Sequence, residues 1–208
     1  MLTRDYKSSA PGEYYHAYNR GNAKEPVFLD DDDYRFFLLR LDQNLSSDIA
    51  VNRHFRPLPP NSFSLISYCL MPNHFHLLLR QDRDIPTSKL IGKICTSYSM
   101  YFNKKYGRVG HVFQDQFKQS HASTNRSVVW LSAYIHNNPV KASLVKYAAD
   151  WSWSSYRNYT DNTFGAPPCK TEIIMEQFKN SAEYATFSAE ALEISRHSFS
   201  EALLLDNS

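Results

Sequence analysis

Two histidines at strand spacing carry the clearest chemical signal in this chain. His74 and His76 lie inside an apolar run at residues 64–80. Residues i and i+2 of a β-strand share a face, so both imidazoles point to one side, while Phe75 and Leu77 point to the other and anchor the strand in a core. Two imidazoles on a rigid surface can ligate a divalent cation. A pair of polar residues on a solvent-facing strand is the alternative, and so short a pattern does not separate the two.

A tyrosine near the end of a predicted helix is the second candidate. Tyr134 precedes Asn138 by four residues, a spacing that puts both on one helix face. A phenol can attack a phosphodiester when it is aligned and the phosphate charge is relieved. Pro139 disfavours helical geometry in the residue before it, so we expect the helix to close there. Tyr134 can also be a core aromatic next to Trp130 and Leu131, and that alternative stays open.

The elements that position these residues follow from apolar periodicity and turn signals. We expect a hairpin of two strands joined by a short turn at residues 71–73. The predicted strands are 14–20, 63–70, 74–80 and 110–118. The predicted helices are about 30–45, 87–106 and 126–137. This order predicts an α+β fold, a ferredoxin-like antiparallel sheet with helices packed on it.

The sequence beyond this unit carries weaker signals. We expect residues 1–157 to form one domain and residues 158–208 to form a linker and a C-terminal helical extension. Within the extension, helices are expected at about 172–178 and 182–194, without recognisable chemistry. The aromatic segment 151–156 is expected to clasp the edge of the domain.

Composition limits the class of protein. The 208 residues contain no apolar run long enough for a membrane helix, and the N-terminus lacks a secretory signal pattern. Three cysteines without CxxC spacing indicate neither a disulfide framework nor a cysteine zinc site. A cytoplasmic protein with no membrane partner is therefore expected.

The charge of the chain is unevenly distributed although its net value is only +2. The segment between residues 89 and 146 is strongly basic, with Asp115 as its single acid. Together with 14 Tyr, 13 Phe and 3 Trp, it offers the charge and stacking surfaces that single-stranded nucleic acid uses. We expect Arg20, Lys118 and Arg126 to contact phosphates.

Five short motifs, taken in order, resemble those of the single-tyrosine HUH transposases. They lie at residues 15–22, 71–79, 110–118, 134–140 and 153–156. The resemblance is strongest to the REP-associated tyrosine transposases, relatives of the IS200/IS605 group, and spans about residues 12–157. It implies the HUH endonuclease fold, with His74, His76 and Asn138 as metal ligands and Tyr134 as the nucleophile. IS200-type enzymes carry Gln in place of Asn138, which puts in doubt any transfer of their behaviour, including the swapped-helix dimer.

The resemblance also implies an activity. The implied activity is that of a transposase, a metal-dependent single-stranded DNA transesterase that cleaves and rejoins DNA through a 5′-phosphotyrosine. The implied cofactor is Mg²⁺ or Mn²⁺, and the implied partner is single-stranded DNA that contains a hairpin-forming repeat. Transesterification needs no ATP, in agreement with the lack of a GxxxxGK[ST] loop. The alternatives are a domesticated hairpin-binding protein without productive cleavage and a small-molecule metal hydrolase.

Several features stay open at this level. The recognised hairpin, the preferred metal and the oligomeric state do not follow from the sequence. His16 either faces the same pocket as the histidine pair or is a core histidine. No role is assigned to His111, His121 and His136.

Overall fold

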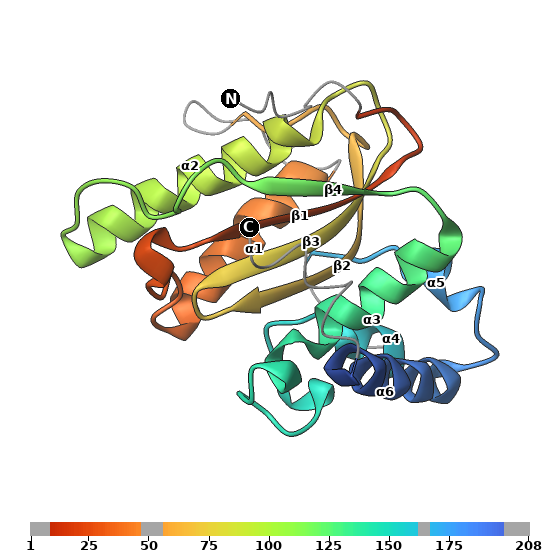
Figure 1. Cartoon of the computed structure of the whole chain (residues 1–208). Coiled ribbons are helices and arrows are strands. Elements are labelled where there is room, and N and C mark those ends of the chain that lie inside the picture. The colour runs from red at the N-terminus through yellow and green to blue at the C-terminus, as the bar shows by residue number, and fades with distance from the viewer. Residues whose placement is uncertain (1–8, 47–55, 162–166, 198–208) are drawn as a thin grey trace.

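The computed structural model describes residues 9–46, 56–161 and 167–197. Its centre is a four-stranded antiparallel sheet in the order β2-β3-β1-β4 (Figure 1). The strands are β1 (Tyr14–Arg20), β2 (Phe63–Met71), β3 (His74–Gln81) and β4 (Lys118–Ala122). The helices α1 (Asp31–Leu45) and α2 (Thr87–Tyr106) alternate with the strands as a ferredoxin-like topology requires. The predicted fold class is therefore confirmed, and β3, the strand that carries both histidines, is central.

The sheet separates two apolar cores. Phe75 and Leu77 belong to the core under α1 and α2, whereas Leu78 belongs to the core under α3 (Asn125–Lys141). Figure 1 shows α3 and α6 on the side of the sheet away from α1. Phe75 and Leu77 therefore anchor β3 from the side opposite to the histidines, as their alternation predicts.

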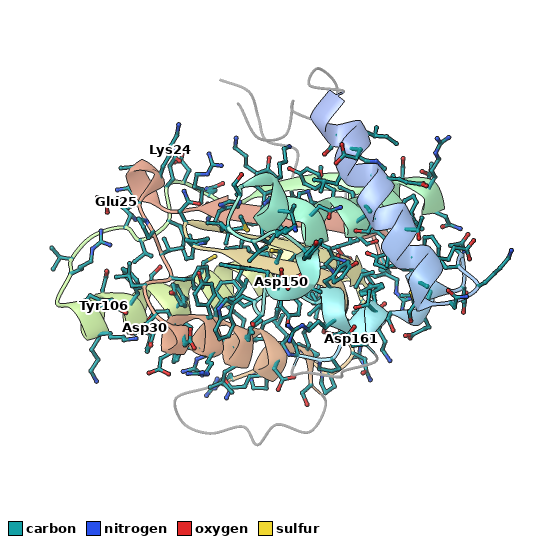
Figure 2. All side chains as sticks on the ribbon, turned by 90° about the horizontal axis from the view of Figure 1, so that it is seen from below. Lys24, Glu25, Asp30, Tyr106, Asp150 and Asp161 are labelled. Atoms are coloured by element: carbon teal, nitrogen blue, oxygen red, sulfur yellow. The ribbon has the colours of Figure 1, made fainter. Side chains whose placement is uncertain are left out.

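Helices α1 and α2 are joined by a charged cluster at one end. Asp30 caps α1, and Lys105 near the end of α2 contacts both Asp30, at 2.7 Å, and the buried Asp33, at 2.9 Å. The hydroxyl of Tyr106 donates to Asp33 at 2.8 Å. Figure 2 shows Tyr106 and Asp30 near one another at this end of the helices. Gly107, in the left-handed conformation, ends α2 where the sequence predicts.

The predicted fourth strand is wrong in its position. β4 begins at Lys118, where the predicted strand ends, and residues 110–117 form a loop whose one ladder contact is the bridge between Gly21 and Phe113. Val112, Phe113 and Phe117 are buried in the core under α1 and α2. A loop that buries aromatics at irregular spacing resembles a strand in sequence, because both are apolar and lack helical periodicity.

Helix α3 also departs from expectation, since it passes through Pro139 and ends at Lys141. Proline lacks the N–H that would bond to the carbonyl of Ile135. The side-chain amide of Asn138 donates to that carbonyl at 3.4 Å and to the Tyr134 carbonyl at 3.0 Å. Asn138 thus supplies a donor to the carbonyl that the proline leaves without its usual backbone partner.

The C-terminal helices are α4 (Tyr156–Thr160), α5 (Glu172–Met175) and α6 (Ser181–His197), and the predicted helix at 172–178 is shorter than expected. The buried His136 of α3 binds the Tyr184 hydroxyl of α6 at 2.7 Å and the Ser155 hydroxyl at 2.8 Å. Trp151 donates its indole N–H to the Leu70 carbonyl of β2 at 3.0 Å, as expected of a clasp. The domain boundary after residue 157 stays a prediction. Within the described ranges, no helix is both long enough and apolar enough to cross a membrane.

The His136 network predicts a loss of stability in acid. Burial lowers the pKa of His136 to about 3, whereas an unfolded histidine titrates near its ordinary value of 6.5. Between these values the unfolded chain binds a proton that the folded protein does not, so stability falls as pH falls through this window. In this window His136 lowers the free energy of unfolding by about 1.4 kcal/mol for each unit by which the pH falls. Urea unfolding between pH 7 and pH 4 should show a shallower pH dependence for His136→Gln than for the wild type, and equal slopes would contradict the assignment.

Candidate active site

The two histidines of β3 lie opposite the end of β1. His74 pairs with Arg20 and His76 pairs with Tyr18 in the antiparallel register. Their ring centroids are 4.9 Å apart, and the rings are nearly perpendicular. His76 is fully buried, whereas His74 is partly exposed. The pair therefore faces the α3 side of the sheet with one ring deep in the protein and one near its surface.

Each ring is held through its Nδ1 atom. The Nδ1 of His74 lies 2.6 Å from Oδ1 of Asn73, whose amide group donates to the Lys24 carbonyl at 3.1 Å. The Nδ1 of His76 lies 2.9 Å from Nε2 of the buried His16 on β1. From the sequence, His16 could either face the same pocket as the histidine pair or be a core histidine. The structure shows that it is buried and in contact with the pair.

The environment keeps His76 uncharged. Burial, followed by the charges of His74, His16, Arg20 and Lys141, holds the pKa of His76 well below its ordinary value of 6.5. An imidazole must be neutral to ligate a metal, because a protonated ring has no lone pair to donate. His76 meets this condition at neutral pH.

Tyr134 of α3 lies over the same part of the sheet. Its ring centroid is 6.1 Å from that of His76 and 6.3 Å from that of His16, and both contacts are edge-on. The ring also stacks against Trp130 with centroids 5.5 Å apart, and only 7% of the residue is exposed. The tyrosine is thus both a packed aromatic and a neighbour of the histidine pair, so the two readings of the sequence do not exclude each other.

Two cations approach this centre. Lys141 lies two helical turns after Tyr134, with its Nζ 5.5 Å from the centre of the tyrosine ring. Arg20 lies opposite His74, and its charge acts on His76 together with that of Lys141. Sequence reasoning named Arg20 but missed Lys141, although the spacing of seven residues from Tyr134 places it on the same helix face.

The other predicted site residues lie at different distances from this centre. Asn138 is on the Tyr134 face of α3, and the hydrogen bonds described for its side chain are those to its own helix. Lys118 begins β4 beside Tyr18, on the strand next to the site. Arg126 is exposed near the start of α3, about 12 Å along the helix from Tyr134. Its role as a phosphate contact stays a prediction.

The donor set fits a divalent metal ion. Nε2 of His76 is buried and has no hydrogen-bond partner among the described residues, and Oδ1 of Asn138 remains an acceptor because its amide nitrogen is the bonded atom. No group of three or more His, Cys, Asp or Glu suited to a metal occurs in the part of the chain that the structure describes. Two imidazoles with an amide oxygen suit Mn²⁺, and Mg²⁺ can use waters to complete its shell.

Residues 58–138 match a family model described as "Transposase IS200 like". The matched segment contains the histidine pair, Tyr134 and Asn138. The resemblance seen in the motifs is thereby confirmed, and this segment is similar to the IS200-like transposases. A search of curated proteins gives no match.

Two solved structures are similar to this chain. A REP-associated tyrosine transposase bound to a REP hairpin superposes with a TM-score of 0.55 at 17% identity, over 76% of this chain and 83% of that one. A candidate transposase from Deinococcus radiodurans R1 gives a TM-score of 0.40 at 13% identity, over 66% of this chain and 97% of that one. The first likeness shows that this chain shares the fold of that transposase.

Proposed function

We propose that this protein is a metal-dependent single-stranded DNA transesterase of the REP-associated tyrosine type. One observation carries the proposal: helix α3 holds Tyr134 with its ring 6.1 Å from that of His76, the buried member of the histidine pair. A weak nucleophile needs an aligned phosphate and relief of charge, and this arrangement supplies a tyrosine, candidate ligands and cations in one place.

The reaction follows from the groups at the site. The phenolic oxygen of Tyr134 attacks phosphorus, the bond to the 3′ oxygen breaks, and the DNA 5′ end becomes a phosphotyrosine. The phenolic proton passes to solvent, and the departing 3′ oxygen takes a proton from solvent to become a hydroxyl. A divalent cation held by His74, His76 and Asn138 would polarise the non-bridging phosphate oxygen. Attack by a 3′-OH on the phosphotyrosine reverses these steps and rejoins DNA.

The charges around the tyrosine support a phosphate substrate. Lys141 lies against the Tyr134 ring, the charges of Lys141 and Arg20 both act on His76, and Lys118 lies on the neighbouring strand. Such contacts fix the position of a nucleic acid without reading its sequence. The structurally similar REP-associated transposase is bound to a REP hairpin. We infer that this chain also takes a hairpin with a single-stranded flank.

The direct test is covalent capture. Purified protein is incubated with a single-stranded oligonucleotide that forms a repeat hairpin, with Mn²⁺, Mg²⁺ or EDTA, and the products are resolved on a denaturing gel. We expect a protein–DNA adduct and a free 3′-OH fragment that depend on the metal. Tight hairpin binding without an adduct in either metal would contradict the proposal and support a binding protein instead.

The proposal also predicts a preference for unpaired DNA. Aromatic and basic groups favour exposed bases, whereas a hairpin stem adds only phosphate contacts. A hairpin with a flanking single strand should bind more tightly than a blunt duplex of equal length, with an affinity that falls steeply as salt rises. Fluorescence anisotropy at two salt concentrations measures both effects. Equal affinities for the two DNAs would contradict the single-strand reading.

A further inference from the structure

The hydrogen bond between His16 and His76 links two adjacent strands. His16 lies on β1 and pairs with Leu78, so it is diagonal to His76 on β3. The two imidazoles stack with centroids 5.1 Å apart and planes 22° apart, and the ring of Tyr18 packs against both. Both histidines are buried. The contact from Nε2 of His16 to Nδ1 of His76 is therefore a buried part of the site, packed on one side by Tyr18.

Only one proton can lie between these two nitrogens. If His16 donates it, neutral His76 carries its own proton on Nε2 and presents an N–H where the metal should bind. If His76 donates from Nδ1, its Nε2 keeps a lone pair. Nε2 of His76 is buried and without a hydrogen-bond partner among the described residues. In the second arrangement neutral His16 carries its own proton on Nδ1, which is also a buried nitrogen, so the cost of burying an N–H is similar in both. The second arrangement is favoured because it alone leaves His76 a lone pair on Nε2 for the cation of the proposed function.

The other histidine of the pair shows the same arrangement. Its Nδ1 lies 2.6 Å from Oδ1 of Asn73, an atom that can only accept. His74 must therefore donate from Nδ1, and its Nε2 is the nitrogen with the lone pair. With the proton of His76 on Nδ1, both imidazoles keep a lone pair on Nε2, the nitrogen that would ligate a metal. The opposite tautomer of His76 would leave the two rings mismatched.

We propose that His16 is a positioning residue that accepts the Nδ1 proton of His76 and so fixes the tautomer in which Nε2 of His76 can ligate a metal. The inference rests on the metal site of the proposed function, although the tautomer is a property of the metal-free protein. His16 itself does not touch the metal or the DNA. Partners of this kind raise the basicity of a metal-bound histidine and orient its ring.

A purely structural role for His16 predicts a different behaviour. If the residue only filled space, an apolar side chain of similar size would serve at least as well, because burying a polar pair is costly without function. A glutamine can place its Oε1 near the position of the imidazole Nε2 and accept the same proton. His16→Gln should therefore preserve the tautomer of His76, whereas His16→Leu should not.

The tautomer can be measured directly. Nuclear magnetic resonance of the metal-free wild type with ¹⁵N-labelled histidine distinguishes a protonated from an unprotonated ring nitrogen. We expect His76 to be protonated at Nδ1 and unprotonated at Nε2 at pH 7.5. A proton on Nε2 would overturn the inference whatever the variants do, so the result does not depend on the folding of any variant.

Metal binding without DNA provides the second measurement. Mn²⁺ titration should give an affinity 10- to 100-fold lower for His16→Leu than for the wild type, on the order seen for such partners, and nearly full recovery in His16→Gln. His76→Ala should lose binding. If His16→Leu binds as the wild type does while His76→Ala does not, His16 has no positioning role and the proposed function stands. If His76→Ala also binds normally, the metal site itself is wrong.

Discussion

Replacing Tyr134 with Phe is expected to abolish covalent capture of DNA. The change removes only the phenolic oxygen, so the stack on Trp130 and the edge contacts with His76 and His16 should persist. Metal and hairpin binding should then stay close to wild-type values, while cleavage falls by on the order of a thousandfold or more, as expected for loss of a nucleophile. A denaturing gel for the adduct and anisotropy for binding separate the two effects.

The control for this variant is Tyr147→Phe, which removes a phenolic oxygen from an exposed tyrosine outside the site. It should cleave as the wild type does. An adduct that persists in Tyr134→Phe would assign the nucleophile to another tyrosine, with Tyr98 or Tyr101 of α2 the next to test. A variant that fails to fold would instead identify Tyr134 as a core aromatic, and the family likeness would then reflect ancestry without activity.

The elements that were predictable from the sequence are those whose signals are local. The strands β1 and β3 follow from alternation, and α2 ends at Gly107 because a left-handed residue stops a helix. Residues 110–117 were not predictable, because their aromatics are buried as a loop against a core that distant elements build. The helix through Pro139 was also missed, because a proline signals a helix end in sequence although here the carbonyl four residues before it accepts from Asn138.

The residues of the candidate site also divide into those that the sequence identifies and those that it does not. His74, His76 and Tyr134 stand out because their spacing places them on shared faces of single elements. The contact of His16 with His76 was not predictable, because it depends on the register between β1 and β3, and register is a property of the folded sheet. Lys141 was missed for a different reason: its position near Tyr134 follows only if the helix continues past the proline.

The metal dependence predicts a large effect at the histidine pair. His74→Ala should eliminate cation-dependent cleavage and leave the fold intact, because His74 is partly exposed and its Nδ1 bonds to a neighbouring turn residue. His76→Ala should also eliminate cleavage. His76→Ala should also be less stable than His74→Ala, because His76 is fully buried. Its loss removes the hydrogen bond to His16, at a cost of about 1–3 kcal/mol. Cleavage assays across a Mn²⁺ series, together with thermal melts, measure both.

Two further variants sharpen this test. His121→Ala is the matched control, because His121 is an exposed histidine of β4 that pairs with Glu13, and it should cleave normally. Asn138→Ala should shift the Mn²⁺ response to higher concentration without abolishing cleavage, since two imidazoles still bind the cation and water can replace an amide oxygen. Its helix should also be less stable beside Pro139, because the Ile135 carbonyl loses the donor that replaces the missing N–H. Full cleavage by His74→Ala at every Mn²⁺ concentration would exclude the histidine pair as the metal site.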